Sequence, residues 1–136
     1  MEPALVFKIT NAFVLIGWIL LLFAARRQHT QQIVLYGVVS VLSLVYTGLI
    51  VPTILNFSPD AFSTLANVKS LFQNDTALAA GWVHYLAFDL FVGAYIVREG
   101  TRCEMPRWKY SLCLPFTFMF GPLGLLFFYL FKVGKR

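Results

Sequence analysis

The sequence is short of charged residues, which make up only 12% of its 136 residues. Soluble domains carry about twice that fraction, so these few charges could not cover a water-facing surface. Hydrophobic residues account for 59% of the chain and aromatic residues for 17%. These proportions exclude an ordinary soluble domain and predict an integral membrane protein whose immediate partner is membrane lipid.

Metal-binding and nucleic-acid-binding patterns are also missing. The two cysteines, Cys103 and Cys113, form no CxxC motif, and the two histidines are too few for a multi-histidine metal site. The net charge of +5 comes mostly from Lys and Arg residues at the ends of apolar runs rather than from a basic stripe interleaved with aromatics. We therefore expect no metal, no cofactor and no nucleic-acid partner.

Four apolar runs are present, each close to the ~20 residues that cross a hydrocarbon layer of ~30 Å. They cover residues 4–25, 33–57, 77–97 and 112–131. The residues between them are too few to fold as a second domain. The sequence therefore predicts an all-α membrane protein, with residues 1–136 forming a single bundle of four transmembrane helices.

Basic residues between the runs indicate how this bundle would sit in a membrane. The connections 26–32 and 98–111 hold six Lys and Arg residues and would share one side, against four on the other side. The positive-inside rule then favours the cytoplasm, or its equivalent, for these connections. The first run has no basic segment before it and is followed at once by Arg26, so we expect a retained anchor rather than a signal peptide.

The connection 58–76 has the pattern of a short amphipathic helix. Ser58 is a suitable N-cap, and Pro59 and Asp60 suit a first helical turn. Apolar residues then recur at Ala61, Leu65, Val68 and Phe72. We expect a short interfacial helix between the second and third transmembrane helices, which would be either a plain connector on the membrane surface or a lid over a cavity.

The third run carries ionisable residues near its middle. A charged side chain at that depth costs roughly 2.5–3.5 kcal/mol, so His84 and Asp89 need an explanation. On a helical projection, Phe88 and Tyr95 fall beside His84. Such residues either link helices structurally or form a functional site, and an acid, an imidazole and two phenols together favour a site. The candidate catalytic residues are His84, Asp89, Tyr85 and Tyr95.

The fourth run contains helix-breaking residues at membrane depth. Pro115 and Pro122 are seven residues apart, and Gly121 and Gly124 flank the second proline. A helix opened here would expose backbone groups, which a membrane tolerates only where protein or a cavity covers them. The alternative is a simple proline kink that shapes the bundle.

Two motifs in these runs resemble those of the abscisic-acid-deficient-four-like membrane protein family. They are GWVHYLAFDLFVG at residues 81–93 and LPFTFMFGPLG at residues 114–124. The resemblance covers essentially the whole chain and implies a four-helix membrane unit. It also implies a link to carotenoids, because plant members of the family are associated with neoxanthin synthesis from violaxanthin in plastid membranes.

The resemblance implies an intramembrane isomerase that acts on a carotenoid or related isoprenoid. Turning an epoxide into an allenic alcohol needs an acid at the epoxide oxygen and a base at a vinylic proton. Burial in lipid favours a neutral carboxyl, so we expect Asp89 to be the acid and His84 the base. Either Tyr85 or Tyr95 would relay protons or bind oxygen. The expected substrate-binding residues are Gly81, Trp82, Phe88, Phe118, Met119, Gly121 and Pro122.

Two other functions stay open. The chain could be a non-catalytic protein that binds a carotenoid or assembles, as a homo-oligomer or with enzymes of the carotenoid pathway. It could also be a small transporter that uses Asp89 and His84 as a proton relay, although the sequence shows no inverted repeat. Because the plastid-targeting extension of plant members is absent, we expect a bacterial plasma membrane, or a plastid membrane if the source is a plant or alga.

Overall fold

The computed structural model describes residues 2–56 and 58–134, and over these ranges it is helical, with no strand. The helices are α1 (Pro3–Phe23), α2 (Thr30–Gln32), the π-helix η1 (Ile33–Val39), α3 (Ser40–Ile54), α4 (Leu65–Leu71), α5 (Asp75–Arg102), α6 (Arg107–Phe120) and α7 (Pro122–Val133). Phe57, with which the expected second helix ends, and the tail residues Lys135 and Arg136 lie outside the described residues.

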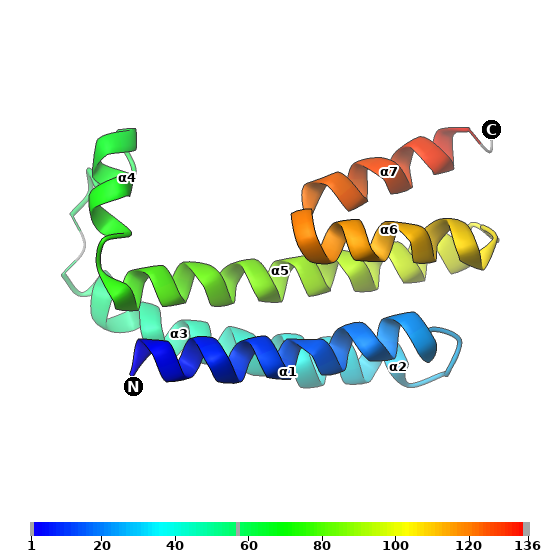
Figure 1. Ribbon diagram of the computed structural model, residues 1–136, viewed down its shortest axis with the longest axis horizontal. Coiled ribbons are helices and arrows are strands. Elements are labelled where there is room, and N and C mark those ends of the chain that lie inside the picture. The colour runs from blue at the N-terminus through cyan, green and yellow to red at the C-terminus, as the bar shows by residue number, and fades with distance from the viewer. Residues whose placement is uncertain (1, 57, 135–136) are drawn as a thin grey trace.

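Three helical stretches in the described residues are long and apolar enough to cross a membrane. They are α1, the continuous stretch Thr30–Ile54 formed by α2, η1 and α3, and α5. These stretches lie side by side (Figure 1). The most apolar window of α5 is 56% buried, against 33% in α1 and 22% in Thr30–Ile54. The central helix of the fold is therefore α5, and the prediction of membrane-type helices is confirmed.

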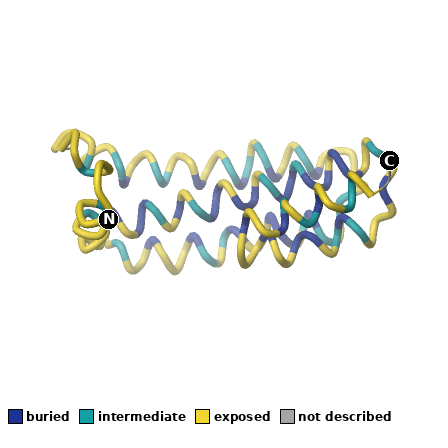
Figure 2. The backbone as a smooth tube through the Cα atoms, turned by 90° about the horizontal axis from the view of Figure 1, so that it is seen from above, coloured by how far each residue is buried: buried dark blue, intermediate teal, exposed yellow. Residues whose placement is uncertain are grey.

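The central helix is longer than the expected run 77–97. Its first turn is capped by Asn74, whose side-chain oxygen accepts hydrogen bonds from the backbone N–H groups of Thr76 and Ala77, at 3.0 and 3.1 Å. At its other end the helix continues to Arg102, and Glu99 near this end is paired with Arg102 and Lys132. Buried backbone is concentrated where the long helices face one another, whereas the α4 end is mostly exposed (Figure 2).

The fourth apolar run does not form one transmembrane helix, so the expected helix over 112–131 is wrong. The chain is broken at Gly121, where φ is +38° and ψ is −88°, between α6 and α7. The two short helices then form a hairpin that enters the bundle and returns to the same end (Figure 1). Gly124 permits this close return, since a Cβ there would overlap the Thr117 side chain.

Contacts along α5 establish the direction of each arm of the hairpin. In α6, Tyr110 packs on Gly100 and the carbonyl groups of Phe118 and Met119 meet Tyr85, so α6 runs antiparallel to α5. In α7, Tyr129 meets Tyr95 and Lys132 meets Glu99, so α7 runs parallel to α5. A through-going helix would have put Lys132 at the opposite end of the bundle.

Most of the described positive charge lies at one end of the molecule, and the hairpin adds Lys132 to it. The start of α1 and the end of α7 lie at opposite ends of the molecule, and the end of α7 lies on the side of the connections that follow α1 and α5 (Figure 1). The described basic residues of this end are Arg26, Arg27, Arg98, Arg102, Arg107, Lys109 and Lys132. The rest of the described chain carries Lys8 in α1 and Lys69 in α4. In a four-helix arrangement Lys132 would lie at the other end, so the described basic residues would divide six to three instead of seven to two.

The helix between α3 and α5 is shorter than expected. Residues 59–63 form turns, and α4 begins only at Leu65, capped by the Thr64 hydroxyl, which accepts a 3.1 Å hydrogen bond from the Asn67 backbone N–H. The prediction of Ser58 as the N-cap is therefore wrong. The short helix lies crosswise over one end of the bundle (Figure 1).

Candidate functional site

A largely apolar pocket lies between α3, α4 and the first half of α5, and His84 is part of its wall. Its volume is about 490 Å³. The lining residues are Tyr46, Ile50, Thr53, Ile54, Phe62, Leu71, Phe72, Ala77, Gly81 and His84. We call this the inner pocket. Its volume lies within the range of about 300–1,000 Å³ that is usual for small-molecule sites.

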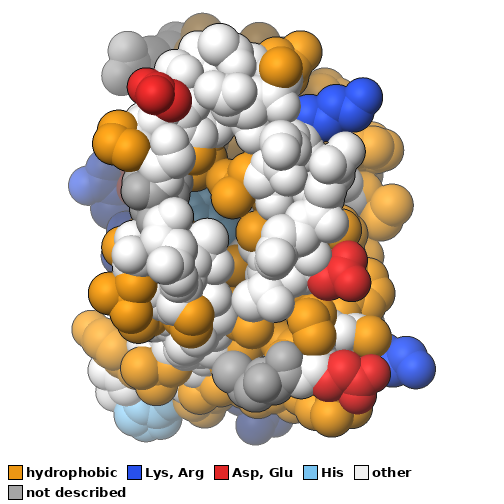
Figure 3. Space-filling model, turned by 90° about the vertical axis from the view of Figure 1, so that its left-hand side faces the viewer, with side chains coloured by type: hydrophobic (Ala, Val, Ile, Leu, Met, Phe, Trp, Pro, Cys, Tyr) orange, Lys and Arg blue, Asp and Glu red, His pale blue; other side chains and the backbone are white. Residues whose placement is uncertain are grey.

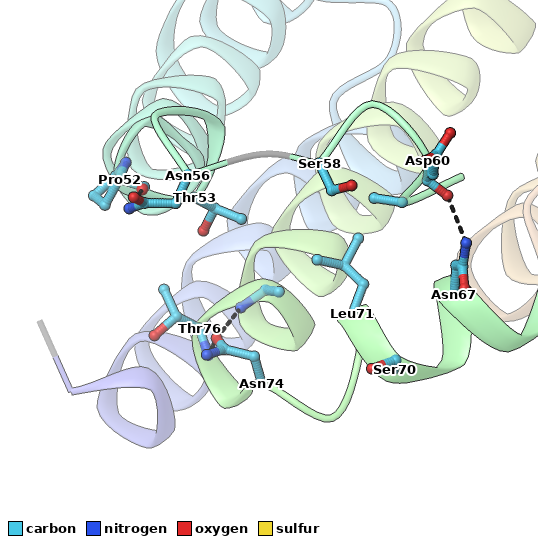
Figure 4. A pocket seen from close by; sticks show the side chains of 12 residues that line it. Pro52, Thr53, Asn56, Ser58, Asp60, Asn67, Ser70, Leu71, Asn74 and Thr76 are labelled. Carbon is cyan, nitrogen blue, oxygen red and sulfur yellow. Dashed lines mark hydrogen bonds between the residues drawn. The ribbon is translucent and has the colours of Figure 1, made fainter. Parts of the chain in front are cut away.

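A second and more polar cavity of about 690 Å³ adjoins the inner pocket and shares Thr53, Leu71 and Ala77 with it. We call this the mouth. Figure 3 shows a hollow at this end of the molecule, and Figure 4 shows the lining side chains. The polar residues of the mouth are Thr53, Asn56, Ser58, Asp60, Asn67, Ser70, Asn74 and Thr76. A molecule could thus place a hydroxyl-bearing part in the mouth and an apolar part in the inner pocket.

The wall of the inner pocket depends on a close contact between Phe72 and Gly81. A Cβ at Gly81 would lie 2.6 Å from Cε1 of Phe72, so only a glycine lets the ring lie this close to α5. The Phe72 backbone N–H donates to the Val68 carbonyl at 3.1 Å, which places Phe72 at the end of α4. Gly81, which was expected to bind substrate, therefore makes room for the Phe72 ring in the pocket wall.

His84 is surrounded by aromatic rings rather than by acids. Its ring centroid lies 5.6 Å from that of Tyr46 in α3 and 4.6 Å from that of Phe88, one turn further along α5. His84 and Tyr46 are the titratable side chains among the described residues that line the inner pocket. Tyr46 was not predicted from the sequence, because nothing near it in its apolar run distinguishes this tyrosine from a core residue.

Asp89 lies on a different side of α5, at the tip of the hairpin. Its side chain packs against Gly121, where an added Cβ would overlap the Oδ1 atom. Only 8% of Asp89 is exposed, and Asp89 is not among the residues that line the inner pocket or the mouth. The structure therefore does not bring His84 and Asp89 to one pocket.

Tyr85 lies with Asp89 rather than with His84. Its hydroxyl donates to the backbone carbonyl oxygens of Phe118 and Met119, at 3.3 and 3.0 Å. Trp82 stacks near Tyr85, with ring centroids 5.4 Å apart, and its indole N–H donates to Oδ1 of Asn11 at 2.9 Å. The two sequence motifs, which are far apart in the chain, thus meet at the hairpin tip.

The remaining predicted residues lie in different surroundings. Tyr95 pairs with the Tyr129 hydroxyl at 3.4 Å, well away from both pockets along α5. Pro122 begins α7 directly after the break, and its missing N–H is compatible with that first position. Phe88 and Met119 are each 58% exposed on the outer surface.

Comparisons with known proteins place these features in context. A family model described as ABA DEFICIENT 4-like matches residues 5–128, a range that includes all residues of the inner pocket, the mouth and the hairpin tip. The protein named ABA DEFICIENT 4, chloroplastic, from Arabidopsis thaliana is 30% identical over 63 residues, which is 46% of this chain and 27% of that protein. No solved structure matches. Because the matched plant protein is named as chloroplastic, the comparisons do not support the expectation of a bacterial plasma membrane.

Proposed function

Because this chain belongs to the ABA DEFICIENT 4-like family, we propose that it binds an oxygenated carotenoid, or a related isoprenoid, in the inner pocket and isomerises it by acid–base chemistry. The proposal rests on one observation: His84 and Tyr46 line the same apolar pocket, and their rings lie next to each other. An imidazole and a phenol are groups that can exchange protons with a substrate, and the aromatic wall suits a polyene.

The pocket suits the end of a long substrate rather than all of it. At about 490 Å³ the inner pocket takes a ring and the adjoining part of a chain, while the rest of an isoprenoid lies in lipid. Exposed Phe62 and Ile54 at its border, 63% and 57% exposed, offer apolar contacts along that path. The hydroxyl and amide groups of the mouth can bind an oxygen on the ring.

The proposed reaction moves one proton within the substrate and leaves its composition unchanged. The Tyr46 hydroxyl donates its proton to an epoxide oxygen while the adjacent carbon–oxygen bond breaks. His84 removes a vinylic proton, and the electrons of that carbon–hydrogen bond form the second double bond of an allene. The proton on His84 then returns to the Tyr46 oxygen, so the two side chains end as they began.

In this proposal Tyr46 replaces Asp89 as the acid. Asp89 does not line the pocket that holds His84 and packs against Gly121 on another side of α5, so it does not reach a substrate bound there. The proposed role of Asp89 is therefore at the hairpin tip.

The test is turnover of an epoxide substrate by purified protein in detergent. We expect wild-type protein to convert added violaxanthin to an allenic product, and His84→Ala and Tyr46→Phe to lose this conversion. His29→Ala and Tyr36→Phe are matched controls, since His29 lies between α1 and α2 and Tyr36 is 78% exposed. Asp89→Asn should retain turnover. Unchanged conversion by both pocket variants would refute the assignment.

The same experiment separates catalysis from binding. Pigment that co-purifies with the protein, or a changed visible spectrum on addition, reports binding before any product forms. If the wild type binds pigment but does not convert it, the proposed isomerase activity is wrong and the protein is a carotenoid-binding protein. Association as a homo-oligomer, or with pathway enzymes, stays a prediction.

We also propose that α1, Thr30–Ile54 and α5 span the membrane, that α6 and α7 form a re-entrant hairpin, and that α4 lies at the surface. The basic end would face the cytoplasm or its equivalent. Two observations support this arrangement. Basic residues are concentrated at one end, and Lys132 Nζ lies 2.7 Å from Oε1 of Glu99, which places the end of α7 beside the end of α5. In a variant without Cys103 and Cys113, single cysteines at Glu2 and Gly134 should react with an impermeant maleimide from opposite sides of sealed vesicles. Labelling from one side would contradict this arrangement.

A further inference from the structure

The hairpin tip contains a buried carboxyl group that has no counter-charge. Asp89 is 8% exposed, and its Oδ2 atom has no hydrogen-bond partner. None of the salt bridges among the described residues involves it, since these join Glu99 to Arg102 and Lys132. A carboxylate buried without a counter-charge costs several kcal/mol, so Asp89 either keeps its proton or binds a cation.

The two helix ends at the tip do not supply the missing charge. The first turn of α7 carries the positive end of a helix dipole, equivalent to about +0.5 of a charge, and the last turn of α6 carries about −0.5. Both turns meet at Gly121, so their effects on Asp89 largely offset each other. The negative charge of one carboxylate therefore remains.

Other oxygen atoms gather at the same place. The carbonyl groups of Phe118 and Met119 belong to the last turn of α6, where no further helical turn satisfies them. Both accept from the Tyr85 hydroxyl, at 3.3 and 3.0 Å, and each carbonyl oxygen keeps a second lone pair. Tyr85 lies one helical turn from Asp89, close enough for the two side chains to interact electrostatically. Backbone carbonyl groups at the C-terminal end of a broken membrane helix are a recurrent arrangement for binding Na⁺.

We propose that the hairpin tip binds one monovalent cation, held by the Asp89 carboxylate, the Tyr85 oxygen and the carbonyl oxygens of Phe118 and Met119. One positive charge neutralises the single carboxylate, whereas a divalent ion would leave a net charge inside the membrane. Divalent sites also use more carboxylates or several waters, and no group of three His, Cys, Asp or Glu side chains occurs in the described residues. This site does not depend on the proposed isomerase, because it lies outside the inner pocket.

The first experiment measures thermal unfolding of the detergent-purified protein as Na⁺ replaces choline at constant ionic strength. A ligand that binds only the folded state raises the unfolding midpoint and does so saturably, and we expect a rise of about 4 °C or more. Asp89→Asn should abolish the rise. Asp75→Asn, which changes a carboxylate in the first turn of the same helix, should keep it.

The second experiment guards against a variant that fails to fold. Radioactive ²²Na⁺ is equilibrated with wild-type protein and with Tyr85→Phe, and we expect about one ion bound per wild-type chain and at least tenfold weaker binding by the variant. The proposal is overturned if wild-type protein binds no ²²Na⁺, if choline stabilises as well as Na⁺ does, or if Asp89→Asn responds as the wild type does. Any of these results would indicate a carboxyl group that is neutral because it keeps its proton.

Discussion

The two ends of α5 border very different amounts of free space. At the α4 end, the helix lines the adjoining mouth and inner pocket, of about 690 and 490 Å³. At the hairpin end, the cavity beside Ala94 and Tyr95 has only about 10 Å³, and glycines and an ion pair hold α6 and α7 against the helix. In our proposals the open end therefore takes the isoprenoid ligand, whereas the closed end holds the hairpin and one cation.

The largest expected effect is a loss of activity without a loss of stability, from His84→Ala at the open end. General acid–base groups contribute about 10²–10⁴-fold to rate, so turnover should fall at least ~100-fold. The unfolding midpoint should stay nearly unchanged, because His84 is exposed and its neighbours are the rings of Tyr46 and Phe88. Product formation and thermal unfolding, measured on one preparation, check both parts. A large drop in the unfolding midpoint of His84→Ala would contradict the contrast between the two ends of α5.

At the closed end, Gly121→Ala should destabilise the fold strongly. The backbone there has a positive φ, and the new Cβ would overlap Oδ1 of Asp89, so we expect a cost of about 2 kcal/mol or more. Gly37→Ala is the control, because a Cβ at that position meets nothing within 4 Å. Thermal unfolding of both variants measures the two effects. Equal unfolding midpoints would show that Gly121 does not pack against Asp89 at the hairpin tip.

A smaller effect, on ligand affinity, is expected from Phe72→Ala, which removes an aromatic ring from the wall of the inner pocket. Removing the ring that lies over Gly81 should weaken ligand binding about tenfold, which corresponds to ~1.4 kcal/mol of lost apolar contact. The matched variant is Leu65→Ala, on the same short helix but 86% exposed and outside the pocket lining. Titration of the visible spectrum gives both affinities. Equal affinities would exclude Phe72 from the site.

The smallest expected change is from Glu99→Gln, which weakens the link between α5 and the end of α7. Glu99 accepts from Arg102 at 2.9 and 3.0 Å and from Lys132 at 2.7 Å. We expect a modest fall in the unfolding midpoint that shrinks as salt is added, since salt screens ion pairs. A double-mutant cycle with Lys132→Met measures the coupling. No coupling would mean that the pair does not help to hold the hairpin.

Much of the architecture could be predicted from the sequence. Long apolar runs must cross lipid as helices, since a membrane offers no water to the backbone, and this correctly predicted α1, the stretch Thr30–Ile54 and α5. The helix-breaking pair Gly121-Pro122 was also recognised. Its consequence was not, because a kink and a full reversal need the same residues, and only packing against α5 distinguishes them.

The candidate site was predicted less completely. The sequence predicted His84 and Asp89 as base and acid of one site, although a helical projection places them about 140° apart around the helix. In the fold, α3 and α4 enclose a pocket beside His84, whereas the hairpin packs against Asp89. Tyr46 and Phe72 were missed because an isolated aromatic residue in an apolar run carries no signal of its own.

The sequence by itself determined that the chain is helical and enters a membrane, because hydropathy and backbone hydrogen bonding are properties of each segment taken alone. It also determined the family, through two motifs on α5 and the hairpin. Only the tertiary structure decided that Lys132 returns to Glu99, that Asp89 meets Gly121 and that His84 faces Tyr46. Those pairings depend on which helices pack together, and packing is a property of surfaces that the linear pattern does not contain.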